Sequence, residues 1–253
     1  MLNDLTIAYQ TERGRRPRNE DMLALPLAMI GRDINEHIHA FDADHRDLVE
    51  KGILALVADG VGGQTNGDVA SQLIATQVAK RYYDDPSADR AHCLQRVVEA
   101  ANRDLWQEIQ AGTEMATTLT AAVIRHDQLL IAHVGDSRAY LQHDGKWHQL
   151  TADHTRHQRW LNECRGHEPA DNRLARSMGQ KAQVAVDLWC FPLEAHDRIL
   201  LCSDGLSSHL DILTQSNSIE SLQAQLIKMI DLAYDNGSQD NISGILIHIH
   251  AIE

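Results

Sequence analysis

Five short segments of the sequence place an acidic residue beside glycine or asparagine at the end of a strand-like run. In chain order, the acids are Glu20 with Asp21, Asp59, Asp136, Asp204 and Asp240. A strand that ends abruptly in such a segment delivers a carboxylate to the rim of a sheet, where glycine lets a ligand approach closely. One such segment is ordinary turn chemistry. Five in one chain favour another interpretation, in which several acids converge on hard cations.

Ligation by oxygen alone selects Mg²⁺ or Mn²⁺ over zinc, which favours histidine and cysteine. Two such ions about 4 Å apart can share a water molecule, lower its pKa and orient it for in-line attack on phosphorus. A nearby arginine can hold phosphate oxygens in a planar fork. Arg16, just ahead of Glu20 and Asp21, is the candidate for that role.

The elements that must position these acids are predicted from hydrophobic periodicity. Strands are expected at residues 5–9, 52–57, 118–124, 128–134, 139–142, 184–190, 198–202 and 242–249. Helices are expected at residues 67–83, 88–111 and 218–234. The helical stretches separate groups of strands, a pattern that favours an antiparallel α+β fold over a doubly wound parallel sheet. The Asp144-Gly145 pair predicts a tight hairpin turn, and one domain is expected over residues 1–253.

Eight motifs in order along the chain carry a family resemblance. They are RPRNED (16–21), VADGVGG (57–63), ATTLTAAVI (116–124), VGDSRAYL (134–141), LTADHT (150–155), LARSMG (174–179), LLCSDGL (200–206) and QDNIS (239–243). The series resembles the metal-dependent serine/threonine protein phosphatases of the PPM (protein phosphatase 2C) family, as a bacterial-type stand-alone catalytic domain. The resemblance implies a four-layer αββα sandwich, in which two antiparallel β-sheets are flanked by helices and the metal site lies at one end.

The resemblance also implies a set of metal ligands for two Mn²⁺ or Mg²⁺ ions. Asp59 matches the ligand that bridges the two metals, and the carbonyl of Gly60 matches a ligand of the second metal. Asp204 and Asp240 match ligands of the first metal. Glu20 matches the acid that reaches the second metal, often through water.

Other positions match supporting roles or depart from the family pattern. Asp21 matches a supporting acid, Asp136 a residue that helps to hold a third metal in some members, and Arg16 the phosphate-binding arginine. Val61 stands where some members have a histidine proposed as general acid, and Ser208 stands where an acid commonly serves the third metal. These two departures leave the general acid and the third metal open.

The resemblance implies hydrolysis of phosphoserine and phosphothreonine in proteins by a metal-activated water, without a covalent intermediate. The expected partners are phosphorylated proteins and a serine/threonine kinase that the enzyme opposes. The alternative is a regulatory pseudo-phosphatase that binds metal and partners with little turnover. An unusual, arginine-containing flap between His154 and Leu174 motivates this alternative, together with Val61 and Ser208. The complete set of acids weighs against it.

Composition excludes several other classes of function. The chain has 23 basic and 36 acidic residues and a net charge of −13, which disfavours nucleic acid and anionic membrane surfaces as partners. Aromatic residues make up only 4%, so base-stacking surfaces are not expected. Four scattered cysteines, without a secretory signal, favour a reduced, cytoplasmic protein.

Three side-chain groups have simpler interpretations than a reactive site. The histidines between His37 and His45 are interpreted as part of an exposed loop rather than a metal site. Cys202, next to the acids, is interpreted as a buried strand residue rather than a nucleophile, because no base is placed beside it. His154 is interpreted as a structural residue that orients the corner before the flap.

Overall fold

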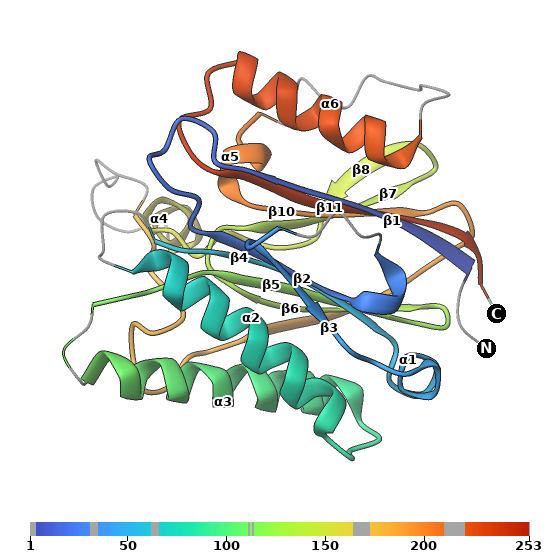
Figure 1. The fold of residues 1–253 in the computed structure, drawn as a ribbon, viewed down its shortest axis with the longest axis horizontal. Coiled ribbons are helices and arrows are strands. Elements are labelled where there is room, and N and C mark those ends of the chain that lie inside the picture. The colour runs from blue at the N-terminus through green and yellow to red at the C-terminus, as the bar shows by residue number, and fades with distance from the viewer. Residues whose placement is uncertain are drawn as a thin grey trace.

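The computed structural model describes residues 4–30, 35–61, 66–110, 112, 114–163, 173–209 and 221–252. Two sheets lie face to face in this structure (Figure 1). The five-stranded sheet has the order β1 (Asp4–Glu12), β11 (Ile242–Ala251), β10 (Arg198–Cys202), β7 (Arg138–His143) and β8 (Lys146–Gln149). The six-stranded sheet has the order β3 (Ile38–Phe41), β2 (Asp21–Pro26), β4 (Ile53–Asp59), β5 (Leu119–Arg125), β6 (Gln128–Val134) and β9 (Asp187–Pro192).

Helices cover the outer faces of both sheets. Figure 1 shows α2 (Gly67–Asp84) and α3 (Arg90–Gln110) against the six-stranded sheet and α6 (Leu222–Asp235) against the five-stranded sheet. Shorter helices are α1 (His45–Lys51), α4 (Arg156–Glu163), α5 (Asp204–Ser207) and the 3₁₀ turn Leu27–Met29. The predicted αββα sandwich is therefore confirmed.

Buried apolar side chains form three layers, which lie between the four layers of helices and sheets. In β4, Leu54 and Leu56 pack toward α2 and α3, whereas Ala55 and Val57 pack between the two sheets. A strand covered on both faces reads as a continuous apolar run, and Ile53–Ala58 is fully buried. A third layer, which includes Leu226, lies under α6. Of the helices in the described ranges, none combines the length and apolar character that a membrane crossing needs.

One part of the predicted sheet arrangement is wrong. The sheets were expected to be antiparallel, and no strand was expected at residues 21–26 or 38–41. The structure has β2 and β3 there, and they pair in parallel. Parallel neighbours need a crossover connection rather than a tight turn. The expected exposed loop between His37 and His45 is also only partly correct, because β3 and the start of α1 occupy much of it.

The β7–β8 hairpin agrees with the turn prediction. Asp144 and Gly145 have φ angles of 50° and 74°, which are the left-handed values that a type I′ turn requires at both central positions. The following strand, Lys146–Gln149, pairs with β7 from His143 to Tyr140. The edge of the five-stranded sheet is thus fixed by a two-residue turn that the sequence predicts.

Candidate metal centre

Strand register brings the predicted acids to one end of the sandwich. Asp21, the first residue of β2, lies directly opposite Asp59, the last residue of β4. In the other sheet, the end of β10 lies opposite the starts of β7 and β11, with Cys202 paired to Arg138 and Gly244. Asp136 shortly precedes β7, Asp240 shortly precedes β11 and Asp204 follows β10, so all three carboxylates belong to the same end.

Gly60 brings the end of β4 against the start of α2. Its N–H donates to the carbonyl of Glu20 at 3.1 Å, and a Cβ placed on Gly60 would lie 2.4 Å from the carbonyl oxygen of Gly67. A residue other than glycine would therefore force the two backbone segments apart. The carboxylate of Glu20 lies against the first turn of α2, since its Cδ is 3.1 Å from the position of a Cβ on Gly67.

Asn241 holds the Arg16 loop in place, and the sequence reasoning missed this role. Its side chain is buried, and its Nδ2 donates to the carbonyls of Arg13 and Arg18 at 2.8 Å each. Its Oδ1 accepts from the N–H of Glu20 at 2.9 Å. The available signal was its position in QDNIS, next to Asp240.

Burial and mutual repulsion raise the pKa values of the clustered carboxyl groups. Burial raises the pKa of Asp21 to about 7; the Ser243 and Ser203 hydroxyls oppose this rise, and neighbouring carboxylates add to it. Burial also raises the pKa of Asp204 to about 6, with Asp240 adding to the effect. Charges held together in this way lower the free energy of unfolding unless a cation compensates them.

Asp59 and Asp136 belong to the same electrostatic cluster. Burial is the largest cause of the rise in the pKa of Asp59, followed by the charges of Asp21 and Asp204. Burial raises the pKa of Asp136 to about 7, and Asp204 contributes again. The structure thus brings together the predicted carboxylates of both sheets.

Arg16 lies at the cluster, as predicted. Its Nη2 donates to Oδ2 of Asp240 at 2.5 Å, and its side chain is 42% exposed. This hydrogen bond is the main cause of a raised pKa of the guanidinium. Its Nε is buried and has no hydrogen-bond partner, so the group retains donor capacity for an anion.

The donor set fits divalent cations that prefer oxygen ligands. Oδ1 of Asp204 is buried without a hydrogen-bond partner, and a buried carboxylate oxygen is costly to leave uncompensated. Among the described residues, no three His, Cys, Asp or Glu side chains are already arranged to hold an ion. Bound ions would therefore have to draw the gathered carboxylates inward, against their repulsion and the Arg16–Asp240 ion pair. The ligand assignments remain predictions.

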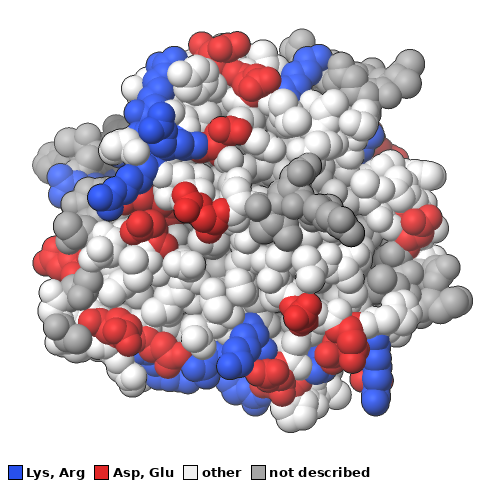
Figure 2. Space-filling view, viewed as in Figure 1, with Lys and Arg blue, Asp and Glu red and all other residues white. Residues whose placement is uncertain are grey.

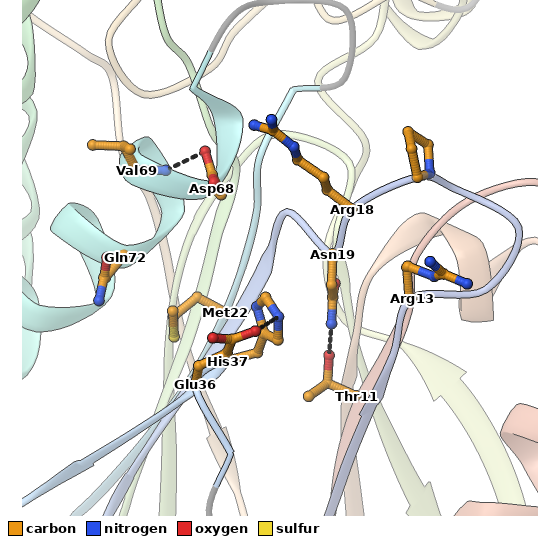
Figure 3. A pocket seen from close by; sticks show the side chains of 11 residues that line it. Thr11, Arg13, Arg18, Asn19, Met22, Glu36, His37, Asp68, Val69 and Gln72 are labelled. Atoms are coloured by element: carbon orange, nitrogen blue, oxygen red, sulfur yellow. Dashed lines mark hydrogen bonds and ion pairs between the residues drawn. The ribbon is translucent and has the colours of Figure 1, made fainter.

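A pocket of about 530 Å³ adjoins this centre on the side of Glu20. Figure 3 shows Arg18 from the loop before β2 and Asp68 from the start of α2 on facing sides, with Glu36 and His37 below. Burial is the largest cause of a raised pKa of Glu20. The charge of Asp68 adds to this rise, and the charge of Arg18 opposes it. Because its walls carry both signs of charge, charge alone does not select an anion for this pocket.

Cys202 is fully buried, and burial raises the pKa of its thiol. The interpretation of this residue as a strand residue rather than a nucleophile is therefore supported.

The arginine-containing flap between His154 and Leu174 lies only partly within the described residues. Arg156 is the first residue of α4 and Arg159 lies within it, whereas Arg165 lies outside the described residues.

Comparison with known proteins decides the family. Residues 36–246 match the family profile described as protein phosphatase 2C. The chain belongs to the protein phosphatase 2C family. It is 34% identical over 221 residues to the serine/threonine protein phosphatase PstP of Mycobacterium tuberculosis, a match that covers 82% of this chain and 42% of PstP. It is 31% identical over 214 residues to the serine/threonine phosphatase stp of Listeria innocua, covering 78% of this chain and 85% of that protein.

Solved structures of protein phosphatase 2C relatives have the same fold. A crystal structure of mycobacterial PstP superposes with a TM-score of 0.78 at 29% identity, covering 97% of this chain and 99% of that one. A second structure, the PstP catalytic domain in complex with two manganese ions, gives a TM-score of 0.75 at 30% identity, covering 97% and 98%. The chain spans less than half of the full-length mycobacterial protein, so the match to PstP concerns its catalytic domain.

Proposed function

We propose that the chain hydrolyses phosphoserine and phosphothreonine in proteins with two Mn²⁺ or Mg²⁺ ions and without a covalent intermediate. The observation that carries the proposal is the meeting of buried carboxylates from both sheets beside Arg16. Two further findings support it: relatives named serine/threonine phosphatases, and the two manganese ions in the PstP catalytic domain.

The residues divide between the two ions as the family pattern implies. Asp59 would serve both ions, Asp204 and Asp240 would serve the first, and Glu20 and the Gly60 carbonyl would serve the second. Asp21, paired with Asp59 in the sheet, would support it from behind. When bound, the ions supply Lewis-acid chemistry that activates water and neutralises charge on the phosphoryl group.

The chain's own residues bind and orient the phosphate. Arg16 offers donors to phosphoryl oxygens in a planar fork, and its loop is held by the bonds from Asn241 to Arg13 and Arg18. Val61 carries no ionisable proton, so position 61 cannot protonate the leaving serine or threonine oxygen, and the proton must come from solvent or another group. Asp136 is retained as a candidate ligand of a third ion.

Replacing Arg16 with alanine should raise KM for a phosphopeptide and lower kcat/KM by roughly 10- to 100-fold, because a charged donor to the transferring phosphoryl group is lost. Arg16→Lys should recover only part of the loss, since an ammonium cannot form the planar fork. The measurement is steady-state release of inorganic phosphate. Arg15→Ala is the matched control, because Arg15 contacts the carbonyl and ring of Tyr234 instead. Equal kinetics for Arg16→Ala and Arg15→Ala would contradict the role.

The proposed function is tested by incubating the purified chain with phosphoserine, phosphothreonine and phosphotyrosine forms of one peptide. We expect phosphate release from the first two with Mn²⁺ or Mg²⁺, and none after chelation with EDTA. Undiminished activity in EDTA would overturn the mechanism. Mn²⁺ binding without turnover of any peptide would instead favour the regulatory pseudo-phosphatase.

The partner is proposed to be a serine/threonine kinase whose phosphorylation events the chain reverses. The phosphorylated proteins that increase when the gene is deleted, and decrease when it is restored, should overlap the targets of that kinase. Buried free thiols at Cys93 and Cys202 support the expectation of a reducing, cytoplasmic location.

A further inference from the structure

His154 contacts the loop that carries Asp136 at two points. Its backbone N–H donates to the carbonyl of Gly135 at 2.7 Å, and its Nδ1 accepts from the N–H of Gly135 at 3.0 Å. Because Nδ1 accepts, the ring proton of the neutral imidazole lies on Nε2. Both backbone polar groups of Gly135 are therefore satisfied by one residue of another segment.

Gly135 packs closely against Thr118 in a backbone conformation that favours glycine. Its φ angle is +118°, and a Cβ at this position would lie 2.6 Å from Cβ of Thr118. The next residue in the chain is Asp136. A buried N–H that loses its acceptor is costly, so the loop would rearrange if the imidazole were removed.

The opposite side of His154 contacts the stem. We use this term for the residues that flank the segment with α4, which are Thr155 before it and Leu174 to Arg176 after it. Nε2 contacts Oδ2 of Asp187 at 3.1 Å, and Arg176 binds the same carboxylate. The carbonyl of His154 accepts from the N–H of Ala175 at 2.7 Å, and Thr155 bridges to Leu174. Figure 1 shows α4 at the end of the sandwich where α2 begins.

From the Asp136 loop, further hydrogen bonds lead to Asp59. The Oγ of Ser137 lies 2.7 Å from Oγ1 of Thr118. That Thr118 oxygen accepts from the N–H of Asp59 at 3.0 Å, and the N–H of Thr118 donates to the Asp59 carbonyl at 2.8 Å. The predicted bridging ligand is thus connected to His154 through four residues, Thr118, Ser137, Asp136 and Gly135.

A second histidine closes the network behind His154. The ring of His133 lies 4.7 Å from that of His154, and its Nδ1 bonds Oγ1 of Thr120 at 2.9 Å. Thr120 donates to the carbonyl of Ser137 at 3.0 Å. The Asp136 loop is therefore held on both sides, by His154 and by a threonine that His133 fixes.

We propose that His154 is a positioning residue for the metal centre, which fixes Gly135 through Nδ1 and thereby positions Asp136 and Asp59. The proposal rests on the proposed function, because it concerns the metal affinity of that centre. The two ring nitrogens divide the task. Nδ1 holds the metal-centre loop, and Nε2 holds the stem through Asp187.

Two substitutions separate the two nitrogens. His154→Asn places an amide oxygen close to the position of Nδ1, so it can still accept from Gly135 but no longer reaches Asp187. His154→Gln reaches toward Asp187 but withdraws the acceptor from Gly135. Asp187→Asn weakens the stem contact and leaves His154 in place, so it is the matched control.

The readout is Mn²⁺ binding to the full chain without substrate, measured by titration calorimetry. His154→Gln should weaken Mn²⁺ binding by roughly 10- to 100-fold, as expected when an outer contact that orients a ligand is lost. His154→Asn and Asp187→Asn should bind Mn²⁺ like the wild type. In NMR hydrogen exchange, the Gly135 and Asp59 amides should exchange faster in the glutamine variant alone.

Equal Mn²⁺ affinity and equal amide exchange in the asparagine and glutamine variants would overturn the proposal. So would equal losses in both, with a matching fall in Tm, because they would reduce His154 to a general stabilising role. If the wild type itself binds no Mn²⁺, the proposed function fails. The exchange of the Gly135 and Asp59 amides then still decides whether His154 fixes the loop that carries Asp136.

Discussion

Replacing Asp204 with asparagine should lower the rate of metal-dependent phosphopeptide hydrolysis by roughly 100-fold or more, because the centre loses a charged ligand. Asparagine has nearly the same size as aspartate, and Oδ1 of Asp204 has no hydrogen bond to lose. The fold should therefore persist while Mn²⁺ affinity falls. Phosphate release at several Mn²⁺ concentrations, with circular dichroism to verify folding, measures both effects.

Asp84→Asn is the control for this substitution, because Asp84 is exposed at the last residue of α2, at the opposite end of the helix from the first turn that Glu20 contacts. It should retain the wild-type rate and the wild-type Mn²⁺ requirement. A folded Asp204→Asn protein with a near wild-type rate would show that this carboxylate does not serve the reaction. The assignment of Asp204 as a ligand would then have to be abandoned.

Replacing Asp21 with asparagine should stabilise the chain in EDTA at pH 7.5, although it weakens the metal centre. In the folded chain the pKa of Asp21 is raised to about 7 from 3.8, so the folded state binds this proton more tightly than the unfolded state. The associated stability is present below pH 4 and is lost as the pH rises toward 7. At pH 7.5 the cost is about 2 to 4 kcal/mol, which asparagine removes.

Thermal unfolding in EDTA between pH 4 and pH 8 measures the Asp21 effect. The wild type should lose stability relative to Asp21→Asn across this range, with a difference of several degrees in Tm at pH 7.5. Added Mn²⁺ should raise the Tm of the wild type more than that of the variant. Asp231→Asn, on the exposed face of α6, is the control. A lower Tm for Asp21→Asn at pH 7.5 in EDTA would contradict the repulsion argument.

The location of the carboxylates was predictable because it depends on short-range rules. An apolar strand that ends in Asp-Gly has few alternatives to a turn at a sheet rim, and this places Asp59 and Asp204 correctly. Strands β6 and β10 match the predicted ranges 128–134 and 198–202. Figure 2 shows acidic side chains both near basic side chains at one corner of this face and scattered elsewhere. Net charge alone therefore did not indicate the site.

The remaining features depend on contacts between distant segments, which single-sequence patterns do not contain. The parallel pairing of β2 with β3 was not predictable, because the four-residue strand Ile38–Phe41 is too short to show a clear alternation of apolar and polar residues. Asn241 bonds the Arg16 loop from 228 residues away. His154 was interpreted as structural, but its link to Asp59 through Thr118 became visible only in three dimensions.

Locating manganese in crystals shows whether carboxylates of the two sheets form a two-metal centre around Asp59. Crystals of the chain grown with Mn²⁺ should show two anomalous-scattering peaks that both contact Asp59, one also near Asp204 and Asp240 and the other near Glu20. Crystals of Asp59→Asn should show weaker peaks or a single peak. Manganese bound only away from Asp59, for example among the histidines between His37 and His45, would contradict the account.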